Sequence, residues 1–301
     1  MSEENPYAVS EAVTAPQVAL DEPVELRPSP ARRGIGAGFS WMAAGLEDFR
    51  RGPWAYVGFV VLVFVAGIAL SSLSNIGFLI DPSIGFVVNM GASLALNLAL
   101  FVLVGGFVLT VHESRRIGMV RFESFLAGFR HPRLGALLGL GGLYLALTLT
   151  IVVSAAVAVF ATMGPTLTAV LASPMALDPS GWLTEDMILT LVIAFFVTGA
   201  FIAVVLGMFF FFSGHLVVLG DVGVFEAMKL SLIACLKNIL PLFLWALIAF
   251  TLTLAGSLLC GLGLLVAMPV VWASTYQAFL EIFTYDVADR LSDAAGQPPT
   301  F

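Results

Sequence analysis

The sequence predicts an all-α membrane protein with six transmembrane helices arranged as three hairpins. Hydrophobic residues make up 59% of the 301-residue chain and charged residues only 11%, against roughly 25% charged residues in ordinary globular domains. The basic residues are also unevenly spread, since the long apolar stretches 53–111, 134–220 and 238–280 contain no Lys or Arg. A ~30 Å hydrocarbon core needs about 20 helical residues. Each stretch is therefore long enough to cross a bilayer twice.

The positions of the basic residues predict the orientation of these hairpins. All 13 Lys and Arg residues fall into four clusters: Arg27, Arg32, Arg33, Arg50 and Arg51; Arg115, Arg116, Arg121, Arg130 and Arg133; Lys229 and Lys237; and Arg290. Cytoplasmic segments collect Lys and Arg, so the N-terminus, the C-terminus and the segments between hairpins are expected on the cytoplasmic side. The leader is acidic and contains prolines, unlike a signal peptide, and the first span is therefore expected to be retained.

The elements follow in order from these patterns. Residues 1–36 are rich in Glu, Pro, Ala and Val without periodicity, which predicts a disordered cytoplasmic tail. A six-helix membrane domain is expected over 37–286, followed by a short cytoplasmic tail over 287–301. The expected spans are 54–72, 84–111, 134–163, 187–212, 239–258 and 263–283.

A short amphipathic segment precedes each odd-numbered span. The three segments end in a basic residue followed closely by Pro53, Pro132 or Pro241. Proline blocks the continuation of one helix and is tolerated in the first turn of the next. The sequence therefore predicts three units, each with a cytoplasmic interfacial helix, a proline elbow and a transmembrane hairpin, as a three-fold pseudo-repeat.

The first of these segments indicates a surface for lipid contacts. Its apolar residues recur at 3-4-3 spacing, which places them on one helical face, and two arginines follow. Basic residues near a membrane surface attract anionic lipid by about 1 kcal/mol each. The residues expected to make lipid or interface contacts are Phe39, Met42, Leu46, Phe49, Arg50, Arg51, Arg130 and Lys237. The leading hypothesis is a non-enzymatic role in membrane organisation through anionic lipids or another membrane protein at the cytoplasmic face.

The second span carries the most polar face in the predicted membrane domain. Asn89, Ser93 and Asn97 recur every four residues, so they lie on one side of a helix. Such a face can line the polar cavity of a small-solute transporter or channel. It can also join transmembrane helices, because small and amide residues often lie at their interfaces. The second interpretation is favoured, and transport remains the alternative function.

Enzyme, metal and nucleic-acid functions have little support. Ionisable residues in the interior of a membrane span usually mark function. The predicted spans hold no Asp, Glu, Lys, Arg or His away from their ends. His112 and His215 lie at the inner ends of even-numbered spans and are interpreted as helix-end residues. Cys235 and Cys260 have no metal-ligand neighbours at useful spacing. No cofactor or metal site is expected, and no basic stripe interleaved with aromatics suggests nucleic-acid binding.

The third unit contains a recognisable pattern of residues: Glu226, Ala227, Ser231, Lys237, Asn238, Gly261, Gly263, Pro269, Tyr276 and Phe279. With this pattern it resembles a broad bacterial class of uncharacterised six-helix integral membrane proteins. This class is related in pattern to YciC-like inner-membrane proteins and to the membrane domain of some glycerophosphodiester phosphodiesterases. It implies the six-helix fold and a place in the bacterial inner (plasma) membrane. It implies no activity, because the phosphodiesterase chemistry belongs to a separate soluble domain. The oligomeric state and the biological process stay open.

Overall fold

The computed structural model describes residues 24–172, 185–258 and 261–285. These residues are almost entirely helical, and the β-structure among them is one isolated bridge between Leu26 and Thr284. The elements are α1 (Ala37–Arg50), α2 (Pro53–Ile80), α3 (Pro82–Ile117), the 3-10 helix η2 (Phe122–Arg130), α4 (Leu134–Ala172), α5 (Glu185–Phe210), α6 (Ser213–Leu219), α7 (Val224–Lys237), α8 (Ile239–Leu258) and α9 (Leu264–Phe283).

The predicted fold class is confirmed, since the described part of the chain has six helical stretches long and apolar enough to cross a membrane. They are Pro53–Ile80, Pro82–Ile117, Leu134–Ala155, Val197–Leu219, Ile239–Leu258 and Leu264–Phe283. The helices α2, α3 and α4 run beyond the ends of their predicted spans, whereas α5 is shifted by two residues toward the N-terminus. In particular, α2 continues to Ile80, and α4 continues to Ala172 although Gly164 and Pro165 directly follow its predicted span.

Local residues explain how the helices begin and turn. Pro53 and Pro82 occupy the first turns of α2 and α3, where the missing proline N–H costs nothing. Asp81 caps α3 by accepting the backbone N–H of Ser83 at 2.7 Å. The α8–α9 turn uses Gly261 at φ +79°, a left-handed conformation that favours glycine.

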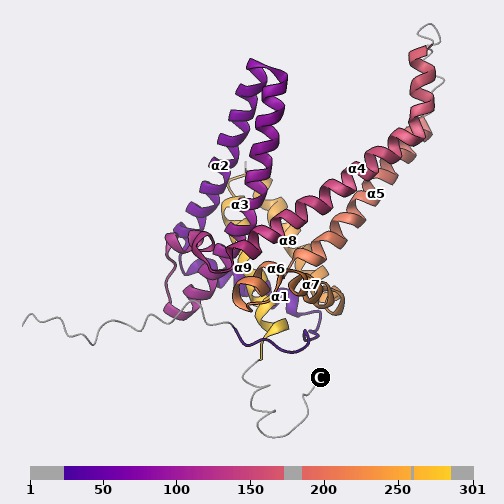
Figure 1. Cartoon of the computed structure of the whole chain (residues 1–301). Coiled ribbons are helices and arrows are strands. Elements are labelled where there is room, and N and C mark those ends of the chain that lie inside the picture. Colours follow the sequence, from indigo (N-terminus) through magenta and orange to yellow (C-terminus); the bar gives the residue numbers. More distant parts are fainter. Residues whose placement is uncertain (1–23, 173–184, 259–260, 286–301) are drawn as a thin grey trace, which may run out of the picture.

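Figure 1 shows the α2–α3 and α4–α5 hairpins diverging from a common base, where α1, α6, α7 and the lower part of α9 gather. The buried core lies toward this base and is built mainly from the second helix of each hairpin. The most apolar 18-residue stretch of each membrane-spanning helix shows this difference. In the second helix of the three hairpins (α3, Val197–Leu219 and α9), 44–50% of this stretch is buried, against 17% in the first helix of each hairpin. The first helices therefore leave most of their surface to the surroundings.

Three short helices, α1, η2 and α7, each precede a hairpin. Each of these three short helices packs mainly against the hairpin of a neighbouring unit rather than against its own. The first helix, α1, lies mainly on α8 and α9, η2 lies on α2 and α3, and α7 lies on α5, α6 and α4. The three contacts together connect the three hairpins in a closed cycle at the base. The order of a short helix followed by a hairpin recurs three times as predicted. The pseudo-repeat itself stays a prediction.

The N-terminal segment differs from the predicted tail over residues 24–36. The backbone N–H of Val24 donates to Leu219, that of Arg27 to Phe283 and that of Ala31 to Ile282, at 2.6–2.8 Å. The side chain of Asn238 joins the same segment, accepting from the N–H of Arg33 at 2.8 Å and donating to the carbonyl of Ala31 at 2.9 Å. These bonds satisfy carbonyls at the ends of α6 and α9. Composition alone missed them because the partners lie about 200 to 250 residues away along the chain. Residues 1–23 and 287–301 of the predicted tails lie outside the described residues.

Candidate functional site at the base of the bundle

The inner face of α1 is built for close approach to the third hairpin. A side chain added at Gly38 would lie 2.6 Å from the carbonyl oxygen of Pro241, and one added at Gly45 would lie 2.7 Å from the backbone nitrogen of Ser274. Only glycine allows the backbones to come this near. Trp41 and Asp48 lie on the same face and are buried. The helix is thus held with one side against α8 and α9.

Asp48 makes the strongest polar contact of this face. Its two carboxylate oxygens accept Nε and Nη2 of Arg115 from α3, at 2.8 and 2.6 Å. Asp48 is 1% exposed, and a paired arginine is the usual way to bury a carboxylate. The guanidinium also lies over the ring of Tyr276, 4.9 Å from its centroid. This pair ties α1 to α3 and α9.

The polar contacts continue along α9. Arg115 donates to the side-chain oxygen of Gln277 at 2.6 Å, and Gln277 donates to Glu281 at 2.9 Å. The indole N–H of Trp41 donates to the other oxygen of Glu281 at 2.9 Å. We name Trp41, Asp48, Arg115, Gln277 and Glu281 the basal network. Of these five residues, only Arg115 was interpreted from the sequence, as a marker of orientation.

The two histidines contact different residues of α9. The ring of His112 forms a 2.7 Å hydrogen bond with the hydroxyl of Tyr276, and the ring of His215 contacts the hydroxyl of Thr275 at 3.2 Å. His215 is packed between Phe212 and Phe279. The histidines thus help to join α3 and α6 to α9 and do not form a pair with each other.

The predicted lipid-contact residues of α1 divide between its two faces. Phe39 and Leu46 are 61% and 37% exposed, and Arg50 and Arg51 are also exposed. Met42 and Phe49 are each only 8% exposed. They belong to the buried core, so the structure does not place them for lipid contact. The reason is that the buried face includes Gly38, Gly45 and Asp48, which an apolar pattern does not count.

The other two short helices also present apolar and basic side chains outward. On η2, Phe122, Leu126 and Phe129 are exposed next to Arg130, whereas Phe125 is buried. On α7, Phe225 and Leu236 are exposed on the helix that carries Lys229 and Lys237. We name these outward-facing side chains the basal surfaces: Phe39, Leu46, Arg50 and Arg51; Phe122, Leu126, Phe129 and Arg130; Phe225, Leu236, Lys229 and Lys237.

The basic groups of the basal surfaces differ in their existing contacts. Arg51 pairs with Glu47 at 3.2 Å, and the Lys237 ammonium donates to the hydroxyl of Ser29 at 2.7 Å. In the described part of the chain, Arg50 and Arg130 form no ion pair. These two arginines therefore present positive charge that no described carboxylate neutralises in an ion pair.

The polar residues of the second span do not gather around a described cavity. Asn89 and Ser93 are exposed on α3, and Asn97 is half-buried. The side-chain oxygen of Asn97 is buried without a hydrogen-bond partner. None of these three residues lines the apolar groove between α2 and α9. Their role as a polar cavity stays a prediction.

Comparison of the chain with protein-family models, with curated proteins and with solved structures finds no significant match. The resemblance carried by the third unit therefore remains an expectation from the sequence. Among the described residues, no group of three or more His, Cys, Asp or Glu side chains could hold a metal ion. What the geometry defines is an all-α membrane protein with three short helices that face outward at one end.

Proposed function

We propose that the protein is a non-enzymatic integral protein of the bacterial inner membrane that organises the membrane through contacts of the basal surfaces with anionic lipid. One observation carries the proposal. All three short helices bury one side against a neighbouring hairpin and expose apolar side chains next to basic ones on the other. This combination suits a helix lying at a membrane interface. The basal end would face the cytoplasm, with both chain termini on that side.

The physical basis is the sum of two contributions. Exposed side chains such as Phe39 and Phe225 bury apolar area in the acyl-chain boundary, at about 25 cal/mol per Å². Basic residues near the surface add about 1 kcal/mol each toward anionic lipid. Because Arg50 and Arg130 have no ion-pair partner among the described residues, their attraction does not require breaking a salt bridge.

The proposal is tested on the full chain reconstituted into vesicles of phosphatidylcholine and phosphatidylglycerol. Spin-labelled lipids of each class report how strongly the protein associates with each headgroup. We expect preference for phosphatidylglycerol at low salt and a clear loss of that preference toward 1 M salt, where the Debye length falls to about 3 Å. Equal association of the two lipids at low salt would overturn the proposal.

Transport by way of Asn89, Ser93 and Asn97 is the alternative function. The structure gives it less support than the basal surfaces, because these three residues do not line the largely apolar groove between α2 and α9.

A further inference from the structure

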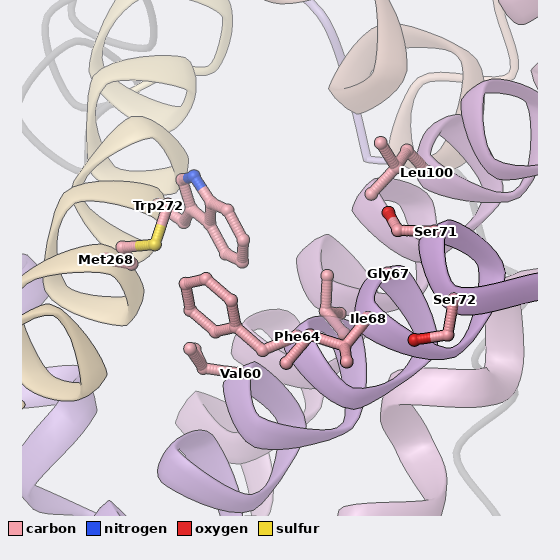
Figure 2. Close-up of a pocket in the computed structure, with 10 residues that line it drawn as sticks. Val60, Phe64, Gly67, Ile68, Ser71, Ser72, Leu100, Met268 and Trp272 are labelled. Carbon is pink, nitrogen blue, oxygen red and sulfur yellow. The ribbon is translucent and has the colours of Figure 1, made fainter. Parts of the chain in front are cut away.

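An apolar groove lies between the first and third hairpins. One end of it adjoins the buried core near the base, where Trp272 packs against Phe59 and Phe107. It has a volume of about 540 Å³ and is formed by one face of α2, by Leu100 of α3 and by two residues of α9. Figure 2 shows Phe64 of α2 reaching toward Met268 and Trp272 of α9 across this space. Every wall of the groove comes from a helix long and apolar enough to cross a membrane.

The α2 wall has a regular helical pattern that sets the length of the groove. Its residues recur at three- and four-residue steps from Val60 to Ser72, which places them on one face. At 1.5 Å per residue, this face is about 18 Å long. One leaflet of a bilayer contributes half of the ~30 Å hydrocarbon thickness, or about 15 Å. The groove is therefore about as long as the hydrocarbon of one leaflet and runs along a membrane-spanning helix.

The chemistry of the groove changes at one end. Most of the lining is aliphatic or aromatic carbon, whereas Ser71 and Ser72 lie at the end farthest from Pro53. Within the described residues, neither serine hydroxyl forms a hydrogen bond. A hydroxyl without a partner is costly in hydrocarbon. An occupant with a long apolar part and a polar oxygen-bearing end would satisfy both parts of the groove.

We propose that this groove binds one acyl chain of a membrane phospholipid, with the ester and glycerol oxygens near Ser71 and Ser72 and the chain extending toward Val60 and Trp272. The surrounding bilayer supplies this molecule at high concentration, and its chain matches the length of the groove. The site is separate from the basal surfaces and does not need their charge. Its occupant is defined by the acyl chain and the ester region, whatever the headgroup.

Gly67 gives a direct way to close the groove. It lies on the α2 wall, and a side chain added there would meet no atom within 4 Å. The Cβ of a larger residue at position 67 would therefore enter the groove without striking the protein. Gly91 of α3 is a matched control, since it too has nothing within 4 Å, is exposed and does not line the groove.

The test uses the full chain reconstituted with a phosphatidylethanolamine that carries a photoreactive diazirine in its acyl chain. This probe has no net charge, so its result does not depend on the anionic lipid preference proposed for the base. After irradiation, labelled positions are mapped by mass spectrometry. We expect labelling concentrated on groove residues such as Phe64 and Met268. Gly67→Leu should lower it by about tenfold, equivalent to ~1.4 kcal/mol, and Gly91→Leu should leave it unchanged.

The smaller variant Gly67→Ala should lower groove labelling by an intermediate amount, and it serves if the leucine variant fails to fold. Two results would overturn the proposal. One is labelling of the groove that is the same in Gly67→Leu as in the wild-type protein. The other is labelling spread evenly over the outward residues of α2, such as Val61 and Val65, which would show only general contact with surrounding lipid.

Discussion

Asp48 and Arg115 form a bidentate ion pair that joins α1 to α3, with N–O distances of 2.8 and 2.6 Å. The carboxylate is almost fully buried, whereas the Arg115 side chain keeps 21% of its exposure. Together with the close packing of Gly38 and Gly45, this contact sets which side of α1 faces the protein. It therefore also determines which side chains of α1 remain outside.

We predict that Asp48→Asn strongly destabilises the protein, because Arg115 would keep a partly buried charge without its partner. Removing one member of a buried ion pair costs about 3–5 kcal/mol, and the partial exposure of Arg115 favours about 3 kcal/mol. Chemical unfolding in detergent, followed by Trp fluorescence, measures the loss. A double-mutant cycle with Arg115→Met should show strong coupling. Losses that simply add would show that the pair does not hold α1 in place.

The close approach of α1 to α9 predicts a second, purely steric effect. Gly45→Ala would place a carbon 2.7 Å from the backbone nitrogen of Ser274, so the two helices would have to separate. We expect a loss of about 1–3 kcal/mol in the free energy of unfolding. Gly36→Ala is the control, because nothing lies within 4 Å of that position. Equal stability of the two variants would contradict the described packing.

The division of α1 into an inner and an outer face can be tested with two matched substitutions. Phe39→Gln replaces a mostly exposed side chain and should change the free energy of unfolding in detergent by no more than about 0.5 kcal/mol. Met42→Gln would bury an amide and should cost about 2 kcal/mol or more. Thermal unfolding of both variants provides the measurement. The reverse order of stability would show that α1 is rotated from the described position.

Cys235 provides a prediction about pH. Burial in α7 raises the pKa of its thiol to about 12, so at neutral pH the group is protonated in the folded protein. Because the thiolate is the reactive form, Cys235 should resist maleimide at pH 7–8 and react only after unfolding or at strongly alkaline pH. The experiment uses a Cys260→Ser background and a gel-shift reagent. Rapid labelling of the folded protein at pH 7 would contradict this prediction.

Much of the fold could be predicted from composition and the placement of basic residues. The six spans, the short helices before the odd-numbered spans and the proline elbows each depend on residues close together in sequence. The α8 helix illustrates this, since its predicted and observed limits agree at 239–258. The C-terminal ends of α2 and α4 could not be predicted, because an apolar helix can extend past the minimum length that a bilayer requires.

The hairpin against which each short helix packs could not be predicted from the sequence in the same way. The apolar spacing of Phe39, Met42, Leu46 and Phe49 suggested one lipid-facing side, but the protein-facing side is centred on two glycines and a carboxylate. Glycine contributes close backbone contact that no hydrophobic pattern records. Arg115 was fully explained as a marker of orientation, so nothing in the sequence required Asp48 as its partner 67 residues away.

Arg50 and Arg130, which form no ion pair with a described residue, are proposed to attract anionic lipid to the basal surfaces. The direct measurement is the preference of the reconstituted protein for spin-labelled phosphatidylglycerol over phosphatidylcholine, in an Arg50→Gln/Arg130→Gln variant. Each arginine is expected to contribute about 1 kcal/mol, so the variant should show a clearly weaker preference than the wild-type protein, although Arg51, Lys229 and Lys237 remain. Arg133→Gln is the control, because Arg133 is already paired with Asp221, and it should keep that preference. An unchanged preference in the double variant would contradict the proposed role of the basal surfaces.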